Sequence, residues 1–347
     1  MVVNTWDGAA DTDWNTAGNW DSTGVTDRVP TSADDVVIAN VSNNPVMGDG
    51  LNPEIKSLKI ESGGHLTAGA NTITINDNNA ENHVANNLGT FVHSNCTIVI
   101  TGPTDSHTTL KGFTSSHPLN NLTINNSGSN RTTFMEGAIE IEGDLVLTDG
   151  TFDTQGQGPL DVVGDVTLAS GTIFNGGTTT ISHGSLTIAS GATYSATGGT
   201  TTITTKHSGT NYILDNNGTF THNNGTVTVT GEGSLSLNTG VTPTNKLNNL
   251  IINFAGAGAT ALYGALTIEG AFTITDGYYS PQGQGGDSGT TVYGNTSVAS
   301  AGVLGDGSDG KMTFHGLVTN LGTLTLLQGQ TYKFNGGLRQ LGTFTTP

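Results

Sequence analysis

One stretch of the sequence occurs twice, and it constrains the fold more than any other feature. The stretch EGDLVLTDGTFDTQGQG covers residues 142–158, and EGAFTITDGYYSPQGQG covers residues 269–285, with nine of 17 positions identical. The offset is constant, since Gly143 corresponds to Gly270 and Gly158 to Gly285. Repeated units of this kind stack on one another, because a single unit cannot bury its apolar face alone. The sequence therefore predicts a stacked array.

The duplication extends well beyond this stretch. The segment NNLGTFVHSNCTIVITG at residues 86–102 matches DNNGTFTHNNGTVTVTG at residues 215–231, and the motif LNNL occurs at 119–122 and again at 247–250. These matches divide the chain into four predicted parts: an N-terminal capping segment (1–54), a first superunit (55–184), a second superunit (185–316) and a truncated third unit or C-terminal cap (317–347).

Short runs of alternating apolar and polar residues fill both superunits, for example TITI at 72–75, TIVI at 97–100 and LTI at 186–188. Residues at i and i+2 of a strand face the same side, so such runs bury aliphatic side chains and expose Thr, Ser or Asn. Turn formers such as Asn-Gly and Gly-Gly separate the runs. Nowhere does an apolar spacing of three and four persist for the length of a helix.

Some of these runs recur about every 20 residues, as from Leu168 to Ile188. A coil of about 20 residues with short strands and tight turns predicts a parallel β-helix, in which each coil pairs with the coils above and below. The alternative is an antiparallel β-sandwich or barrel, because Asn-Gly turns also connect hairpins.

The charge balance excludes two classes of partner. The formal net charge is −18, with only 10 Lys and Arg residues in 347. Nucleic acids and anionic membrane surfaces are bound through clustered positive charge, so neither is expected as a partner. No apolar run approaches the 18 residues of a membrane span, so no membrane insertion is expected.

The N-terminal segment up to Asn40 differs from the rest of the chain. It holds all three tryptophans, Trp6, Trp14 and Trp20, in the pattern W-D-G-x5-W-x4-N-W, and the strand-like run DDVVI at 34–38 comes after them. The end of a solenoid must be covered, and three large aromatic residues suit such a cap.

This opening resembles that of many bacterial secreted β-helix proteins, in which autotransporter-type or adhesin-type coils follow. Similar segments occur in phage tail and other virion proteins. The resemblance covers positions 1–40 by motif and the rest only by style. It implies a surface-exposed β-solenoid, and it brings no catalytic residues with it.

Acidic pairs matter because many β-helices are polysaccharide lyases or hydrolases. Glu140 and Glu142 lie at i and i+2 of a predicted strand, which places their carboxylates about 6 to 7 Å apart, near the range of inverting glycosidases. In the second copy Glu140 is replaced by Thr267, and Glu142 recurs as Glu269. A solvated strand face explains this pattern without chemistry, so we expect no enzymatic activity.

Two Asp-rich loops offer oxygen ligands of the kind that Ca²⁺ prefers. One contains Asp306 and Asp309, and the other contains Asp7, Asp11 and Asp13. Neither loop fits a twelve-residue calcium loop or a nonapeptide calcium repeat, and polar turns are the simpler interpretation. No other cofactor is expected.

Aromatic residues are the candidates for a binding surface. Trp6, Trp14 and Trp20 could stack on sugar rings instead of serving the cap. Tyr278 and Tyr279 replace a Thr-Phe pair of the first copy. One of two adjacent strand residues must point outward, so this pair is the better surface candidate.

These observations favour a non-enzymatic structural and adhesive β-solenoid exposed on a virion, as a tail fibre, spike or head decoration protein, that binds a host or neighbouring surface. The opening MVVNTWDGAAD has neither the basic nor the apolar region of a signal peptide, which favours a virion component. A bacterial autotransporter-type adhesin fragment and a glycan-degrading β-helix enzyme are the alternatives.

The expected location is a virion, the extracellular space or a cell surface. The expected partners are other virion or surface proteins and glycans. A homotrimer is a further possibility, because trimerisation hides exposed solenoid edges.

Overall fold

The computed structural model describes residues 2–76, 83–102, 108–127, 132–205, 212–231, 235–238, 246–254, 259–263, 265–281, 289–305, 311–326 and 331–346.

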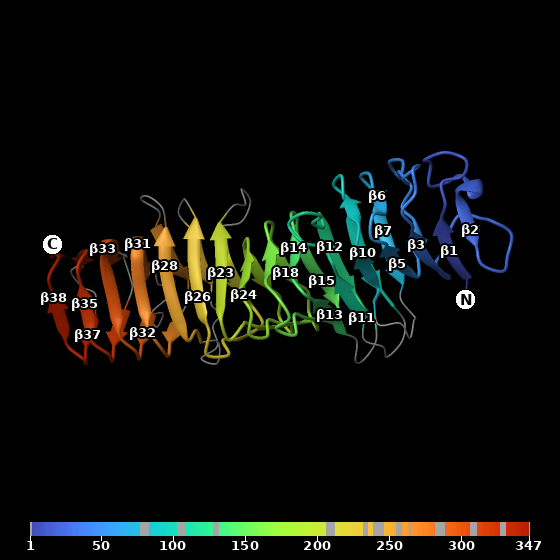
Figure 1. Ribbon diagram of the computed structural model, residues 1–347. Helices are drawn as coiled ribbons and strands as arrows, with labels where there is room; N and C mark the ends of the chain where they lie inside the picture. The colour runs from blue at the N-terminus through green and yellow to red at the C-terminus, as the bar shows by residue number, and fades with distance from the viewer. Residues whose placement is uncertain are drawn as a thin grey trace. The chain divides into compact units, whose positions relative to one another are not determined.

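Within these ranges the chain is an all-β parallel solenoid, and the 3-10 helix η1 (Ala17–Asn19) is the one helical element (Figure 1). The predicted β-helix is confirmed, and the antiparallel sandwich or barrel is wrong, because nearly every strand pairs in parallel with a strand of the next coil. No helix in the described ranges is long and apolar enough to cross a membrane.

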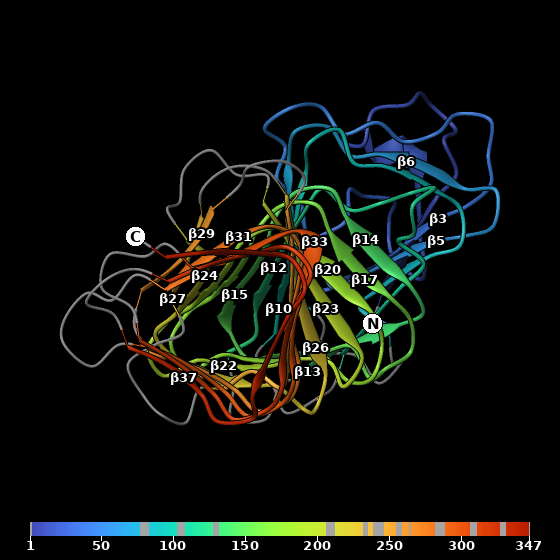
Figure 2. The same ribbon diagram turned by 90° about the vertical axis from the view of Figure 1, so that its left-hand side faces the viewer.

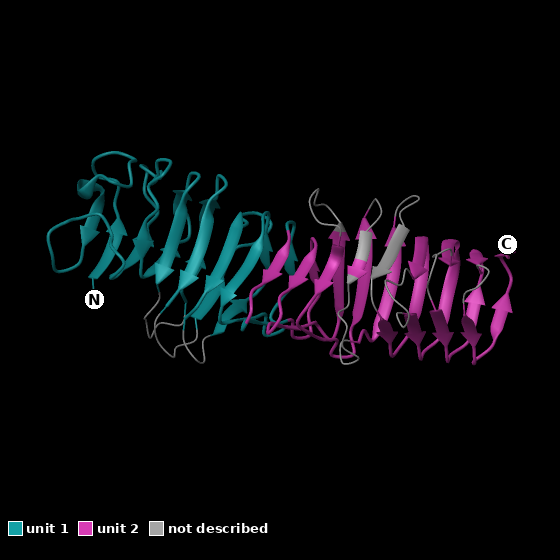
Figure 3. Cartoon of the chain, turned by 180° about the vertical axis from the view of Figure 1, so that it is seen from behind, with its two compact units in different colours: residues 1–164, 171–175 teal, residues 165–170, 176–347 magenta. Residues whose placement is uncertain are grey.

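The chain divides into two compact units, which Figure 3 colours separately. Unit 1 comprises Met1–Gly164 and Gly171–Asn175, and unit 2 comprises Asp165–Ser170 and Gly176–Pro347. The two units are defined by contacts between residues in space. The predicted boundaries at 54, 184 and 316 are defined by repetition of the sequence, so the units do not test them and they stay predictions.

Unit 1 has three walls of strands. The first wall contains, in order, β1 (Val2–Trp6), β3 (Asp34–Ile38), β5 (Ser57–Ile60), β8 (Ala85–Asn87), β11 (Thr108–Lys111), β13 (Thr132–Glu136), β16 (Thr151–Asp153) and β19 (Ile173–Asn175). The second contains β4 (Glu54–Ile55), β7 (Thr72–Asn76), β10 (Thr97–Thr101), β12 (Asn121–Asn125) and β15 (Leu145–Asp149). The third contains the pairs β6 (His65–Thr67) with β9 (Thr90–Val92) and β14 (Ile139–Ile141) with β17 (Leu160–Val162).

Unit 2 is built in the same way. One wall contains β20 (Ile181–His183), β23 (Thr200–Thr205), β26 (Thr226–Gly231), β28 (Asn249–Phe254), β31 (Phe272–Pro281), β33 (Thr296–Gly305), β35 (Val318–Asn320) and β38 (Leu338–Gln340). A second contains β18 (Val166–Leu168), β21 (Leu186–Ile188), β24 (Tyr212–Asn216), β27 (Leu235–Asn238) and β29 (Ala259–Tyr263), then the far halves of β31 and β33, then β36 (Thr323–Thr325) and β39 (Thr343–Thr345). The third contains β22 (Thr193–Ser195) with β25 (Thr219–Thr221), and β30 (Leu266–Ile268), β32 (Gly289–Val292), β34 (Lys311–Phe314) and β37 (Tyr332–Phe334).

Parallel register stacks equivalent residues of successive coils. In Figure 2 the orange strands β31 and β33 run side by side, as their pairing requires. Leu186 lies beside Val166, so this coil has the length of about 20 residues that the sequence predicts. Thr97 lies beside Thr72, so the coil between them is longer. The extra residues lie in the connections, since the paired strands keep their length and register.

The core consists of inward columns of aliphatic side chains. Ile73, Ile98 and Leu122 occupy one register position on β7, β10 and β12, and each is at most 1% exposed. Burial of one such side chain contributes about 1.5 to 3 kcal/mol, so a column shared by several coils holds the stack together. Aromatic pairs extend the pattern, as where Phe314 and Phe334 stack with ring centroids 5.4 Å apart.

The repeated stretch begins at a corner of the coil in both units. A Cβ added at Gly143 would lie 2.1 Å from Oδ1 of Asn121, and one added at Gly270 would lie 2.3 Å from Oδ1 of Asn249. Each asparagine Oδ1 also accepts a hydrogen bond from a backbone N–H of the next coil, at 2.9 and 2.8 Å. The two copies therefore keep one glycine and one asparagine for the same packing reason.

The first coil is closed by the N-terminal segment. Strand β2 (Trp20–Ser22) pairs antiparallel with β1, and Trp6, Trp14 and Trp20 are at most 1% exposed. The Trp20 ring makes edge-on contacts with Trp6 and Trp14, with centroids 5.0 and 4.7 Å apart. Its indole N–H donates to the backbone oxygen of Trp14 at 2.9 Å. The three tryptophans thus form one buried cluster beside β1, and its role as a cap of the solenoid stays a prediction.

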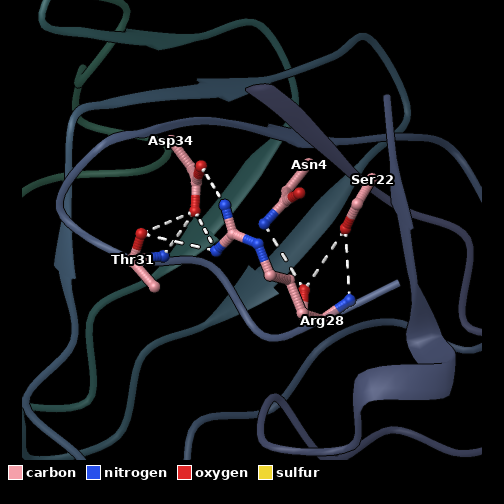
Figure 4. Close-up of polar contacts among 5 residues, drawn as sticks. All are labelled: Asn4, Ser22, Arg28, Thr31 and Asp34. Carbon is pink, nitrogen blue, oxygen red and sulfur yellow. Dashed lines mark hydrogen bonds and ion pairs between the residues drawn. The ribbon is translucent and has the colours of Figure 1, made fainter. Parts of the chain in front are cut away.

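An ion pair with a buried carboxylate fixes the loop that follows β2 (Figure 4). Two nitrogens of Arg28 donate to the two carboxylate oxygens of Asp34, each at 2.6 Å, and Thr31 donates to the same carboxylate through N–H and Oγ1 at 2.8 Å. Burial alone would raise the pKa of Asp34, but the hydrogen bonds and charge of Arg28, with the hydrogen bonds of Thr31, lower it below its usual range. The carboxylate is therefore ionised and holds the loop against β3.

Truncation of the central cap residue tests this account. We expect Trp20→Ala to lower the free energy of unfolding by about 3 to 5 kcal/mol, because it leaves a large cavity beside Trp6 and Trp14. Urea unfolding followed by circular dichroism measures the change. Val25→Ala is the control, since Val25 is 48% exposed and its truncation should change stability by less than about 0.5 kcal/mol. An unchanged unfolding midpoint for Trp20→Ala would contradict the capping role.

A buried histidine makes stability depend on pH. The ring of His183 is 1% exposed; Nδ1 lies 2.8 Å from the Gly184 oxygen, and Nε2 lies 3.1 Å from the Tyr194 hydroxyl. Burial lowers the pKa of His183 from its ordinary value near 6.5 to about 4. The folded chain thus keeps this ring neutral where the unfolded chain protonates it.

The contribution of His183 is complete above pH 6.5 and decreases as the pH falls towards 4, since only the unfolded state binds the proton in that interval. We expect the wild type to lose about 3 kcal/mol more than His183→Gln between pH 6.5 and 4. Urea titrations of both proteins across this range give the difference. Parallel pH dependences would show that His183 is not buried as a neutral ring.

Candidate functional site

Three neighbouring strands in each unit carry outward side chains that are mostly Thr and Asn. The first polar face consists of the outward residues of β7, β10 and β12 in unit 1: Thr72, Thr74, Asn76, Thr97, Val99, Thr101, Asn121, Thr123 and Asn125. The second polar face consists of the outward residues of β23, β26 and β28 in unit 2: Thr200, Thr202, Thr204, Thr226, Thr228, Thr230, Asn249, Ile251 and Asn253.

Parallel register arranges the second polar face in rows. Thr202 lies beside Thr228, and Thr228 beside Ile251, while Thr204 and Thr230 are linked by their hydroxyls at 3.1 Å. Such rows repeat about every 4.8 Å across strands and about 6.6 Å along them. The middle row continues through both ends of the face, as Ser182, Thr202, Thr228, Ile251, Thr273, Ser297, Thr319 and Arg339. The result is a regular array of hydroxyl and amide groups with almost no charge.

The corner that precedes this wall carries a second recurring set. In unit 1, Nε2 of His93 lies 3.1 Å from a carboxylate oxygen of Glu142. In unit 2, Nε2 of His222 lies 3.3 Å from Glu269, and Lys246 donates to the same carboxylate at 2.7 Å. The hydrogen bond from Lys246 is the main reason that the pKa of Glu269 is lowered. His93 and His222, which stand at matching positions of the repeated segments 86–102 and 215–231, therefore make the same kind of contact in both units.

Two further corner residues of unit 2 form an aromatic stack. The rings of Tyr293 and His315 have centroids 4.7 Å apart and planes within 8°. Tyr293 is 54% exposed, and His315 is also exposed. The sequence matches His315 to His183, but the latter is buried, so their recurrence does not preserve one environment. Tyr293 has no neighbouring aromatic residue in the sequence, and the one sequence signal for it is its place beside Gly294, where the first copy has Val163-Gly164.

The carboxylates considered for catalysis lie on the third wall of unit 1. Glu140 of β14 is in register with Asp161 of β17. Burial raises the pKa of Glu140, and the charges of Asp161 and Glu142 raise it further. Glu142 contacts His93, as described above. A carboxyl whose pKa is raised by burial and by neighbouring carboxylates is one feature of a general acid, so a hydrolytic role is a defined alternative that an assay can test.

The predicted sugar-stacking residues lie mostly inside the protein. Trp6, Trp14 and Trp20 are packed together in the cap, and no ring face among them is open to a ligand. Tyr279 is 0% exposed, and its hydroxyl lies 2.7 Å from Oγ1 of Thr290. Burial raises the pKa of Tyr279 far above its usual range. These four residues therefore expose no ring face on which a sugar could stack.

Tyr278 is the outward member of its pair, as the strand alternation requires. It is half-buried on β31, between the inward Gly277 and Tyr279. Its position keeps it a candidate contact residue, although it lies apart from the corner that holds Tyr293 and His315.

The calcium candidates receive no structural support. Asp306 and Asp309 lie outside the described residues. Among the residues that the structure describes, no cluster of three or more His, Cys, Asp or Glu side chains is suited to a metal ion. Calcium binding at Asp306 and Asp309 stays a prediction.

The acidic N-terminal loop uses its carboxylates locally. Asp7, Asp11 and Asp13 each accept a hydrogen bond from the backbone N–H two residues further on, at 3.0, 2.8 and 2.9 Å. The amide of Asn19 also donates to Asp11 at 2.6 Å and is the largest influence lowering the pKa of Asp11. These contacts are those of polar turns, in which Asp side chains bond to nearby backbone.

Comparison of the chain with protein-family models, curated proteins and solved structures finds no match. The structure supports the resemblance of the W-D-G…W…N-W opening to bacterial and phage surface β-helix proteins only in the β-solenoid fold. No family is identified.

Proposed function

We propose that this chain is a non-enzymatic structural and adhesive β-solenoid, exposed on a virion as a tail fibre, spike or head decoration protein, that binds a host or neighbouring surface. The observation that carries the proposal is the second polar face and the row of hydroxyl residues that extends it. An uncharged polar array of this regularity serves no purpose in the core, because all of its side chains point outward.

The recurrence of the face supports the same proposal. The first polar face has Thr72, Thr97 and Asn121 where the second has Thr200, Thr226 and Asn249. Outward positions of a strand are under no packing constraint, so a shared outward pattern indicates a shared use of the surface. An extended surface of weak polar contacts suits multivalent attachment, in which many small contributions add.

The charge of the chain narrows the choice of partner. A net charge of −18 repels anionic surfaces, whereas the polar faces are nearly free of charge. The proposed partners are accordingly other virion or surface proteins and uncharged glycans, and the proposed location is a virion or a cell surface. Homotrimer formation is part of the same proposal. Neighbouring genes for capsid or tail proteins would support it over an autotransporter-type adhesin, which an adjacent outer-membrane barrel gene would favour.

Adhesion through the second polar face gives a direct test. We expect the labelled full chain to bind cells within a panel of bacteria, and the double variant Thr202→Lys, Thr228→Lys to bind several-fold more weakly, because two lysines disrupt the uncharged array. Flow cytometry measures the bound label. Thr219→Lys, at an exposed outward position of β25 on the third wall of unit 2, is the matched control and should bind as the wild type does. Equal binding by the double variant would contradict a role for this face.

The enzymatic alternative is tested with the same protein. We expect no release of reducing ends from a panel of bacterial polysaccharides, since the proposal requires none of the carboxylates to act chemically. Release that disappears in Glu142→Gln would replace the adhesive proposal by that of a glycan-degrading β-helix enzyme.

A further inference from the structure

We propose that the corner of unit 2 around Tyr293 is a binding site for neutral glycans. This inference rests on the proposed adhesive function and names the class of ligand and the residues that recognise it. Within the described part of the chain, Tyr293 and Phe344 are the aromatic residues with large exposed fractions, at 54% and 46%. Of the two, Tyr293 has a ring that a neighbouring ring holds in place.

The stack with His315 orients the tyrosine ring. With centroids 4.7 Å apart and planes within 8°, His315 covers one face of Tyr293. The exposed area of Tyr293 therefore belongs to its opposite face and its edge. An aromatic ring held in one orientation loses little conformational freedom when a sugar packs on it, which favours binding.

The opposite face of Tyr293 is turned towards the coil of Glu269. The corners are adjacent, since the N–H of Gly294 donates to the oxygen of Gly270 at 3.1 Å. The Glu269 carboxylate is engaged by Lys246 at 2.7 Å and by His222 at 3.3 Å. Both residues come from earlier coils, and Lys246 lies close enough to Tyr293 for the two groups to interact electrostatically. Lys246 also reduces the negative field beside it.

Hydroxyl groups flank the ring on both adjoining walls. Outward threonines of β30, β32 and β34 form one row: Thr267, Thr291 and Thr313. Outward hydroxyl residues of β31, β33 and β35 form another: Thr273, Ser297 and Thr319. An aromatic face bordered by neutral hydrogen-bonding groups suits a sugar ring, which presents C–H groups on one face and hydroxyls around its edge.

This corner differs between the two copies in charge and in aromatic content. Glu140 and Asp161 are paired across β14 and β17, where Thr267 and Thr291 are paired across β30 and β32. Val163 occupies the position of Tyr293. The second copy has thus replaced carboxylates by threonines and an aliphatic residue by an aromatic one, while keeping the His–Glu contact. Loss of negative charge together with gain of a platform points to an uncharged ligand.

The test uses the full chain and three neutral probes: cellotetraose, chitotetraose and mannotetraose, with a heparin tetrasaccharide as the anionic comparison. Saturation-transfer NMR detects binding, and isothermal titration calorimetry measures Kd. We expect at least one neutral probe to bind and the heparin fragment not to bind. Tyr293→Val, which installs the residue of the first copy, should raise Kd about tenfold or more, and Tyr293→Phe should stay within about twofold.

Val163→Ala is the matched control, because Val163 is the exposed counterpart in the first copy, and it should leave Kd unchanged. Thermal unfolding of each variant shows that the solenoid is intact. The proposal is overturned if no neutral probe binds, or if Tyr293→Val binds as tightly as the wild type.

Failure of this site and failure of the adhesive function give different results. Cell binding that persists and depends on Thr228, with no binding of any neutral probe, removes the Tyr293 site alone. Loss of specific cell binding removes the adhesive proposal itself, whatever the oligosaccharides do.

Discussion

In-register stacking of parallel coils is the constraint on which the rest of this structure depends. Each backbone N–H and C=O of a strand finds its partner in the coil above or below, so an inward residue must match its neighbours in size and polarity. Columns such as Ile73, Ile98 and Leu122 satisfy this requirement, and the corners need glycine where one coil passes close to the next, as at Gly143 and Gly270. A chain under this constraint varies only on its outward face and in its corners.

The fold could be predicted from the sequence because stacked coils need apolar residues at regularly repeating positions. Alternation of apolar and polar residues predicted the strands, and the repeat predicted which coils are equivalent. The length of individual coils was less accessible: the coil from Thr72 to Thr97 is longer than the coil from Val166 to Leu186, which has the expected length. The length of a connection can differ between coils while the strands stay in register, so it leaves no trace in the hydrophobic pattern.

The candidate sites were harder to predict, because alternation says which side a residue faces but not which coils meet at a corner. The alternation predicts that one of Tyr278 and Tyr279 points outward but not which one, and Tyr279 is the inward member and is buried. Tyr293 was overlooked because it stands alone in sequence, and its partner His315 comes from the next coil. The same holds for His183 and His315, which match in the sequence repeat: His183 is buried and His315 is exposed.

Duplication gives a physical reason why binding would arise at a corner of the second copy. The inward columns of both copies must stay apolar, and Asn121 and Asn249 bind the backbone of the next coil in the same way. Corner side chains carry no such duty, so exchanging Val163 for Tyr293 alters a surface without a cost to the core. The retained contact between His222 and Glu269 then acts as a fixed border, and Thr267 and Thr291 offer neutral hydroxyls where the first copy has the carboxylates of Glu140 and Asp161. Recognition in such a solenoid is therefore decided by single corner residues set on a scaffold that stacking keeps constant.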